Sequence, residues 1–153
     1  MRNAPVEVTH FDGERVVRSL PIELVAGILV VDDSKVMRDM ITACLRSDSS
    51  LLVTHAASGL EAIERLSLQR FDVLILDLNM PDIGGLEVVE FVRGQDVLRE
   101  LPILIVTTRS DDASRKAVLD AGASRFMTKP FTPDVILHEV RLLMTSTGSS
   151  GAS

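Results

Sequence analysis

The chain has 153 residues, enough for one well-packed domain and too few for two of ordinary size. Hydrophobic residues make up 46% of it and aromatic residues only 3%, so the predicted core is aliphatic. The formal net charge of -6 argues against direct binding to nucleic acid, and no apolar run approaches the ~20 residues of a membrane-spanning helix. With no secretory leader pattern at the start, we expect a soluble, cytoplasmic chain that has no membrane partner.

Residues 1–26 stand apart from the pattern that follows and are predicted to be an N-terminal extension. Two β-like runs flank Asp12 and Gly13, which favours a hairpin with a two-residue turn and places Glu7 opposite Arg18. An isolated hairpin is only marginally stable in water. The extension is therefore expected to dock on the domain, to meet a partner or to be a mobile leader, and the sequence does not choose among these.

From residue 27 the chain alternates strand and helix five times. Predicted strands cover 28–31, 51–56, 73–76, 103–106 and 125–128. Predicted helices cover 34–46, 58–69, 86–92, 111–121 and 132–144, with Ser34 as an N-cap, Ser58 and Glu61 as a capping box and Gly122 as a stop. This alternation predicts right-handed βαβ units and thus an α/β fold, a five-stranded, doubly wound parallel sheet with helices on both faces.

The last nine residues, 145–153, are mostly Ser, Gly, Thr and Ala and lack apolar periodicity. They are predicted to form a disordered tail after a single domain that spans residues 27–144. The lone cysteine, Cys44, lies on an apolar helical stripe and has no partner for a disulfide or a zinc site, so a core thiol is expected.

Polar residues follow four of the predicted strands where each strand ends. Asp77 follows an unbroken apolar strand, Asp32 and Asp33 follow the first strand, and Thr107 and Lys129 follow the last two. A single loop aspartate more often caps a helix than carries chemistry. However, parallel strands bring their carboxyl ends to one edge, where α/β proteins bind ligands, and the five side chains are therefore predicted to converge there.

Three carboxylates in one crevice repel one another, by about 4 kcal/mol for a pair 4 Å apart at an effective dielectric near 20. A divalent cation with oxygen ligands removes this repulsion, and Mg²⁺ typically uses one or two carboxylates while keeping room for phosphate. An aspartate can accept a phosphoryl group as an acyl phosphate, a reaction that needs mainly positioning and charge neutralisation. Asp77, Thr107 and Lys129 fit the roles of acceptor, hydroxyl donor and cation.

These motifs, in this order and spacing, resemble the receiver domain of two-component response regulators. The resemblance covers roughly residues 27–144 and rests on Asp32-Asp33, Asp77-x-Asn79-Met80-Pro81-x-x-Gly84-Gly85, Thr107 and Lys129-Pro130. It implies a (βα)5 flavodoxin-like fold and a stand-alone, chemotaxis-regulator-like receiver. It also implies a signalling phosphoacceptor rather than an enzyme, one that catalyses its own phosphotransfer and dephosphorylation.

By the same resemblance, a histidine kinase or phosphotransfer protein would donate the phosphoryl group to Asp77. Mg²⁺ would be held by Asp33, by Asp32 largely through water, by Asp77 and by the backbone carbonyl of Asn79. Thr107 would hydrogen-bond the phosphoryl group and Lys129 would pair with it.

The resemblance further implies a switch in which Thr107 moves toward the phosphate and the motion reaches Phe126 on the last strand. The fourth helix, last strand and last helix would then form the face that docks a downstream protein target. Asn79 and Arg109, each two residues beyond a site residue, would tune phosphate loss, and Lys129-Pro130 is a candidate cis peptide. Phe126 could equally be an ordinary core residue.

Two other functions remain open at this point. A haloacid-dehalogenase-like phosphohydrolase also uses a strand-end aspartate with Mg²⁺, although its nucleophile normally opens an Asp-x-Asp pair on the first strand, where this chain has Asp32-Asp33. A degenerate receiver used only for docking is the third candidate. The chain could also be a fragment of a multi-domain regulator.

Overall fold

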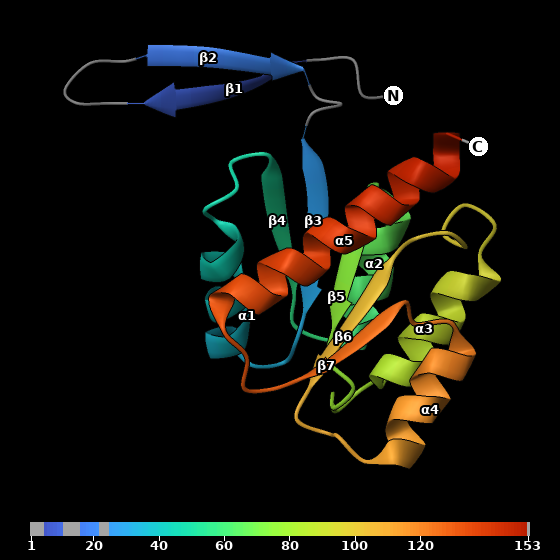
Figure 1. Cartoon of the computed structure of the whole chain (residues 1–153). Helices are drawn as coiled ribbons and strands as arrows, with labels where there is room; N and C mark the ends of the chain where they lie inside the picture. The colour runs from blue at the N-terminus through green and yellow to red at the C-terminus, as the bar shows by residue number, and fades with distance from the viewer. Residues whose placement is uncertain (1–4, 11–15, 22–24, 153) are drawn as a thin grey trace.

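The computed structural model describes residues 5–10, 16–21 and 25–152. Its centre is a five-stranded parallel sheet in the order β4-β3-β5-β6-β7 (Figure 1). The strands are β3 (Ala26–Val31), β4 (Leu51–Ala56), β5 (Val73–Leu76), β6 (Ile103–Thr107) and β7 (Arg125–Thr128). The predicted sheet is confirmed, and the order places β3 and β5, which precede the predicted acidic residues, side by side.

Five helices cover the two faces of the sheet (Figure 1). They are α1 (Lys35–Leu45), α2 (Gly59–Leu68), α3 (Gly85–Gly94), α4 (Asp112–Ala121) and α5 (Pro133–Ala152). Alternate residues of each central strand enter opposite cores, so Leu29 packs with α2 and α3 while Ile28 packs with α1 and α5. Because β5 is buried on both faces, its sequence is continuously apolar, as predicted.

The helix starts follow the predicted caps. Ser34 Oγ accepts the backbone N–H of Met37, and Ser58 Oγ accepts that of Glu61. The Glu61 carboxylate reaches back to the N–H of Ala57, one residue before the cap, so the capping box is shifted by one position. These bonds satisfy backbone donors that a helix start leaves without partners.

The extension contains the antiparallel strands β1 (Pro5–His10) and β2 (Val16–Pro21) (Figure 1). The predicted hairpin pairing is corrected by one residue, because Glu7 lies opposite Ser19 rather than Arg18. Five residues, 11–15, separate the two strands, and an odd number of connecting residues shifts the pairing relative to a two-residue turn. The predicted turn itself lies outside the described residues.

The last helix is longer than predicted. We expected it to end near Met144 and to be followed by a disordered tail over 145–153, whereas α5 continues to Ala152. Most of the added residues are weak helix formers, but none is a proline, so no backbone donor is lost and the helix can propagate. Within the described part of the chain, no helix is both long enough and apolar enough to cross a membrane.

Candidate acidic phosphoacceptor site

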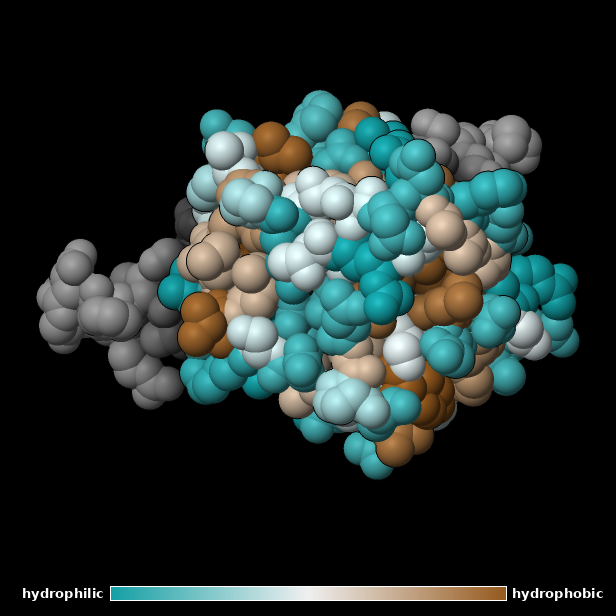
Figure 2. Space-filling view, turned by 90° about the horizontal axis from the view of Figure 1, so that it is seen from below, coloured by the Kyte–Doolittle hydropathy of each residue, from teal (hydrophilic) through white to brown (hydrophobic). Residues whose placement is uncertain are grey.

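The five predicted site residues meet at the carboxyl edge of the sheet. Asp32 and Asp33 follow β3, Asp77 follows β5, Thr107 ends β6 and Lys129 follows β7. Figure 2 looks onto the molecule from below, where hydrophilic residues run through the middle of the face. The convergence predicted from the strand ends is therefore present.

Asp77 is one of the two buried acids of the site, with 5% of its surface exposed. Its backbone N–H donates to the carbonyl of Val31 at 3.0 Å, which continues the β3–β5 pairing to the loop. The Oδ1 atom is buried and accepts no hydrogen bond from any described residue. Burial raises the pKa of Asp77 above its ordinary value, while the Lys129 ammonium lowers this pKa and the Asp32 carboxylate raises it further.

Asp32 is 2% exposed and fully engaged by its neighbours. Its Oδ1 accepts the backbone N–H of Ser34 at 2.9 Å, and its Oδ2 accepts the Lys129 ammonium at 2.7 Å. The same ammonium lies 3.8 Å from Asp77 Oδ2. Lys129 thus bridges the carboxyl ends of β3 and β5 from the loop after β7.

The three carboxylates form a group that fits a divalent cation. One oxygen from each of Asp32, Asp33 and Asp77 lies within 4.8 Å of the others. Asp33 is exposed while the other two are buried, so the cluster opens to solvent on the Asp33 side. A hard cation with oxygen ligands suits this donor set, and the buried Oδ1 of Asp77 is an acceptor that still lacks a partner.

Thr107 completes the buried part of the site and has no exposed surface. Its Oγ1 accepts the backbone N–H of Arg109 at 3.2 Å, and its carbonyl accepts the backbone N–H of Lys129 at 2.9 Å. The second bond ties the loop that carries the lysine to the end of β6. The peptide between Lys129 and Pro130 is cis, as predicted.

The remaining predicted residues lie around the site rather than in it. Asn79 and Arg109 are exposed at the loops after β5 and β6. Phe126 is half-buried on β7, pairs with Ile105 of β6 and has the Arg115 guanidinium 5.5 Å from its ring centre. The structure thus separates a buried acid–lysine centre from an exposed rim and from an aromatic residue one strand away.

Sequence reasoning missed two residues that brace the site. Arg38 of α1 donates from Nη1 to the backbone carbonyl of Asp32 at 2.6 Å. Asp82, in the loop after β5, accepts the backbone N–H groups of Gly59 and Leu60 at the start of α2. No sequence signal singles out Arg38, because Lys35 is a cation still nearer the start of α1.

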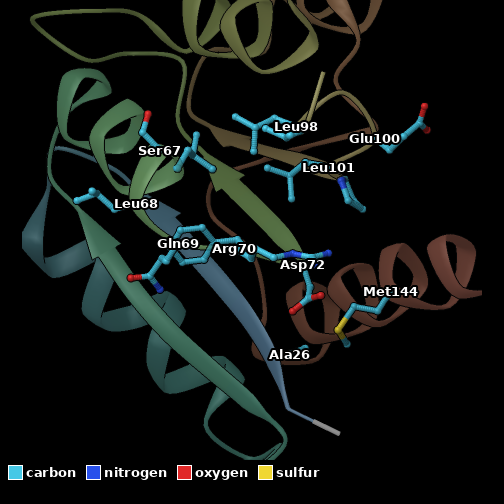
Figure 3. Close-up of a pocket in the computed structure, with 14 residues that line it drawn as sticks. Ala26, Ser67, Leu68, Gln69, Arg70, Asp72, Leu98, Glu100, Leu101 and Met144 are labelled. Carbon is cyan, nitrogen blue, oxygen red and sulfur yellow. The ribbon is translucent and has the colours of Figure 1, made fainter. Parts of the chain in front are cut away.

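A cavity lies at the opposite, amino edge of the sheet. It has a volume of about 740 Å³ and is lined mainly by the segments before β5 and β6, with Met144 of α5 at its rim (Figure 3). Leu68, Leu98 and Leu101 give it an apolar wall, and Arg70, Asp72 and Glu100 supply charge. None of the predicted site residues lines it, so the acidic site is separate from this cavity.

Comparisons with known proteins agree with the geometry. The family model for the response regulator receiver domain matches residues 28–141. The chemotaxis protein CheY1 of Helicobacter pylori is 37% identical over 118 residues, which cover 76% of this chain and 95% of that protein. The response regulator MprA of Mycobacterium tuberculosis is 38% identical over 126 residues, 82% of this chain and 54% of MprA, so this chain spans about half the length of that relative.

Solved structures give the same result. The chemotaxis response regulator CheY4 of Vibrio cholerae superimposes with a TM-score of 0.72 at 36% identity, covering 78% of this chain and 98% of CheY4. The range matched by the family model, residues 28–141, contains Asp32, Asp33, Asp77, Thr107 and Lys129.

Proposed function

The chain belongs to the response regulator receiver domain family, and we propose that Asp77 is the residue on which it receives a phosphoryl group. Receiver domains are signalling phosphoacceptors that work with histidine kinases and downstream effectors. The observation that carries the assignment to Asp77 is its buried carboxylate, which has an unpartnered Oδ1 and lies 3.8 Å from the Lys129 ammonium.

In the proposed reaction, an Asp77 carboxylate oxygen attacks the phosphorus of a phosphohistidine on a histidine kinase or phosphotransfer protein. The new P–O bond forms as the P–N bond breaks, and the departing imidazole keeps the bonding electron pair and takes up a proton. Burial raises the pKa of Asp77, whereas the Lys129 ammonium lowers it and so favours the ionised carboxylate that attacks. The product is an acyl phosphate.

Receiver domains bind Mg²⁺ at an acidic pocket, and the three clustered carboxylates fit that cofactor. The residues that would hold it are Asp33, Asp77, the backbone carbonyl of Asn79 and, largely through water, Asp32. When bound, Mg²⁺ supplies positive charge that offsets the negative charge of the phosphoryl oxygens.

Lys129 and Thr107 would act on the phosphoryl group from the protein side. The Lys129 ammonium already bridges toward Asp77 and can pair with a phosphoryl oxygen placed there. The Thr107 hydroxyl oxygen accepts an N–H from Arg109, which leaves the hydroxyl hydrogen available for a phosphoryl oxygen. Such contacts stabilise charge that develops during transfer.

The output of the switch would run from Thr107 to Phe126 and reach the face formed by α4, β7 and α5. A pocket of about 440 Å³ lies on this face, with Arg115, Phe126 and Val135 among its lining residues. A change in the position of Phe126 would alter this pocket directly. A downstream protein is therefore the proposed partner for this face.

Loss of the phosphate would be self-catalysed, because the groups that stabilise transfer to Asp77 also stabilise attack by water on the acyl phosphate. Asn79 and Arg109 are the proposed tuning residues, since both are exposed beside the site. The phosphohydrolase alternative is not favoured, because the comparisons lead to receiver domains. The docking-only alternative is disfavoured by the complete set of acceptor, acidic and lysine residues.

Incubation with acetyl phosphate and Mg²⁺, followed by intact mass measurement, tests the proposal. The wild type should gain one phosphoryl group and Asp77→Asn should gain none. Asp120→Asn, an exposed aspartate of α4, is the matched control and should behave as the wild type. An unmodified wild type would overturn the acceptor assignment, and steady hydrolysis of unrelated phosphate esters would support the phosphohydrolase.

A further inference from the structure

The peptide that joins Asp32 to Asp33 lies just beyond the end of a strand. The β3–β4 pairing ends at Val31 and Ala56, and the N–H of Asp32 makes one more bond, to the Ala56 carbonyl at 3.2 Å. The carbonyl of Asp32 has left the sheet and needs a donor from elsewhere. Arg38 supplies it, with Nη1 at 2.6 Å.

This contact fixes more than one atom. A peptide unit is planar, so holding the Asp32 carbonyl also sets the direction of the Asp33 N–H and the position of the Asp33 Cα. The Asp32 side chain is independently held by Ser34 and Lys129, whereas Asp33 is exposed. Among the described residues, Arg38 is the side chain that restrains the peptide leading into Asp33.

Arg38 occupies this place at a physical cost. It lies in the second turn of α1, where its N–H bonds to the Ser34 carbonyl. Its Nε is buried and has no hydrogen-bond partner among the described residues. The guanidinium is half-buried and makes one charge-assisted bond, to the Asp32 carbonyl.

We propose that Arg38 is a positioning residue that fixes the Asp32–Asp33 peptide and so directs the Asp33 carboxylate into the acidic pocket. The inference rests on the proposed function of that pocket. Groups that orient a metal ligand without touching the metal typically change metal affinity by about 10- to 100-fold when they are removed. Arg38 would act through Asp33 in this way.

Mg²⁺ binding measured by isothermal titration calorimetry tests the proposal. Arg38→Met keeps an apolar stem but removes the donors, and it should weaken Mg²⁺ binding by about tenfold. Arg46→Met removes the same charge from the exposed end of α1 and should change the affinity less than about twofold, as expected for a screened surface charge. Equal affinities of the two variants would overturn the role of Arg38.

Two further readouts separate positioning from loss of stability. In acetyl phosphate reactions, the Mg²⁺ concentration for half-maximal rate should rise in Arg38→Met, while the rate at saturating Mg²⁺ stays near that of the wild type. In the metal-free protein, the amide resonance of Asp33 should shift in Arg38→Met and not in Arg46→Met. An unmoved Asp33 resonance, or a lower rate that Mg²⁺ does not restore, would contradict the inference.

Two outcomes need a further comparison: an Arg38→Met variant that does not fold, and a wild type that binds no Mg²⁺. If Arg38→Met does not fold, Arg38→Lys is compared with Arg46→Lys, because both keep the charge and only the first changes the donor geometry. If the wild type binds no Mg²⁺ and accepts no phosphoryl group, the proposed function fails. A wild type that does both, beside an Arg38→Met that matches Arg46→Met, removes only the role of Arg38.

Discussion

Lys129 contacts Asp32 more closely than it contacts the proposed acceptor: its Nζ lies 2.7 Å from Asp32 Oδ2 and 3.8 Å from Asp77 Oδ2. The lysine side chain is 10% exposed, and the two carboxylates are 3% and 6% exposed. In the protein without Mg²⁺, this ammonium is the cation nearest to both buried acids, and it partly offsets their repulsion. A phosphoryl group on Asp77 would offer it a stronger partner.

Lys129→Met should therefore destabilise the metal-free protein by about 3 kcal/mol, because it leaves two buried carboxylates without their cation. Added Mg²⁺ should recover part of this loss. Urea unfolding with and without Mg²⁺ measures both effects. Lys116→Met is the control, since Lys116 pairs with Asp120 on the exposed surface of α4 and its loss should cost no more than about 1 kcal/mol. Equal losses in both variants would contradict this account.

The pH dependence of stability should report on Asp77. Because the pKa of Asp77 is raised in the folded protein, folding favours the protonated carboxyl. Its contribution to the free energy of unfolding is full below the ordinary pKa of 3.8 and is lost as pH rises through the raised pKa. In the metal-free protein, Asp77→Asn should therefore be more stable than the wild type near neutral pH. The difference should shrink toward pH 3.8, with a slope of at most about 1.4 kcal/mol per pH unit.

Asp48 provides a control with the opposite sign. The Ser50 hydroxyl, 2.6 Å away, lowers the pKa of Asp48, and Arg141 acts in the same direction. Asp48 thus stabilises the protein above its ordinary pKa, and Asp48→Asn should be less stable than the wild type near neutral pH. Urea unfolding at a series of pH values compares the variants. The same sign of the effect in Asp77→Asn and Asp48→Asn would refute the assignment for Asp77.

The strand-end residues could be predicted from sequence because a parallel sheet fixes where its carboxyl ends lie. A continuous apolar run followed by an acid was enough to place Asp77, and the same rule placed Asp32 and Thr107. Contacts between loops and distant helices carry no such rule. The bond from Arg38 to a backbone carbonyl depends on the direction of one side chain. The two bonds that Asp82 accepts at the start of α2 join residues that are 22 and 23 positions apart in the sequence.

The extension and the end of α5 show a different limit. Pairing in a hairpin depends on the number of residues in its connection, and a plausible Asp-Gly turn at 12–13 favoured a pairing that differs by one residue from that of β1 and β2. The end of α5 depends on how far a formed helix propagates through weak helix formers. Individual propensities differ by less than about 1 kcal/mol, too little to fix that end from sequence.

Gly59 should tolerate no side chain where the loop after β5 packs on α2. A Cβ at this position would lie 2.5 Å from the Ile83 carbonyl oxygen, so the backbone would have to move. Gly59→Ala should destabilise the protein by about 1–3 kcal/mol, although alanine is the better helix former. Gly94→Ala, at a helix end with no atom within 4 Å of the added Cβ, is the control. Thermal unfolding that shows equal stability for both variants would be inconsistent with this packing.

Phe126 should transmit the signal without affecting phosphorylation. In Phe126→Ala, Asp77 should still gain a phosphoryl group, but the amide resonances of α4 should respond less to acetyl phosphate and Mg²⁺ than in the wild type. The physical reason is that the half-buried ring lies between the β6–β7 pairing and Arg115 of α4. Phe91→Ala, which shortens another half-buried phenylalanine packed on the same core, should keep the α4 response. A full response in Phe126→Ala would make the ring an ordinary core residue.

The lifetime of the phosphate should depend on the two exposed residues at the rim. Asn79 follows the acceptor by two positions, and its amide can hydrogen-bond an attacking water. Asn79→Ala should therefore slow phosphate loss by up to about tenfold, which corresponds to the loss of one hydrogen bond worth ~1.4 kcal/mol. Arg109 is held beside Thr107 through its backbone N–H, and its long side chain can cover the acyl phosphate. Arg109→Ala should therefore admit water and speed the loss.

Decay of radiolabelled phosphate, after removal of the donor, measures both rates at fixed Mg²⁺. Arg99→Ala is the control for Arg109, because Arg99 is also exposed but lies in the loop between α3 and β6, at the amino edge of the sheet. Its decay should match that of the wild type. If Asn79→Ala and Arg109→Ala both decay at the wild-type rate, neither residue reaches the attacking water. Hydrolysis would then be governed by the buried groups alone, with Asp77, Thr107 and Lys129 setting the rate.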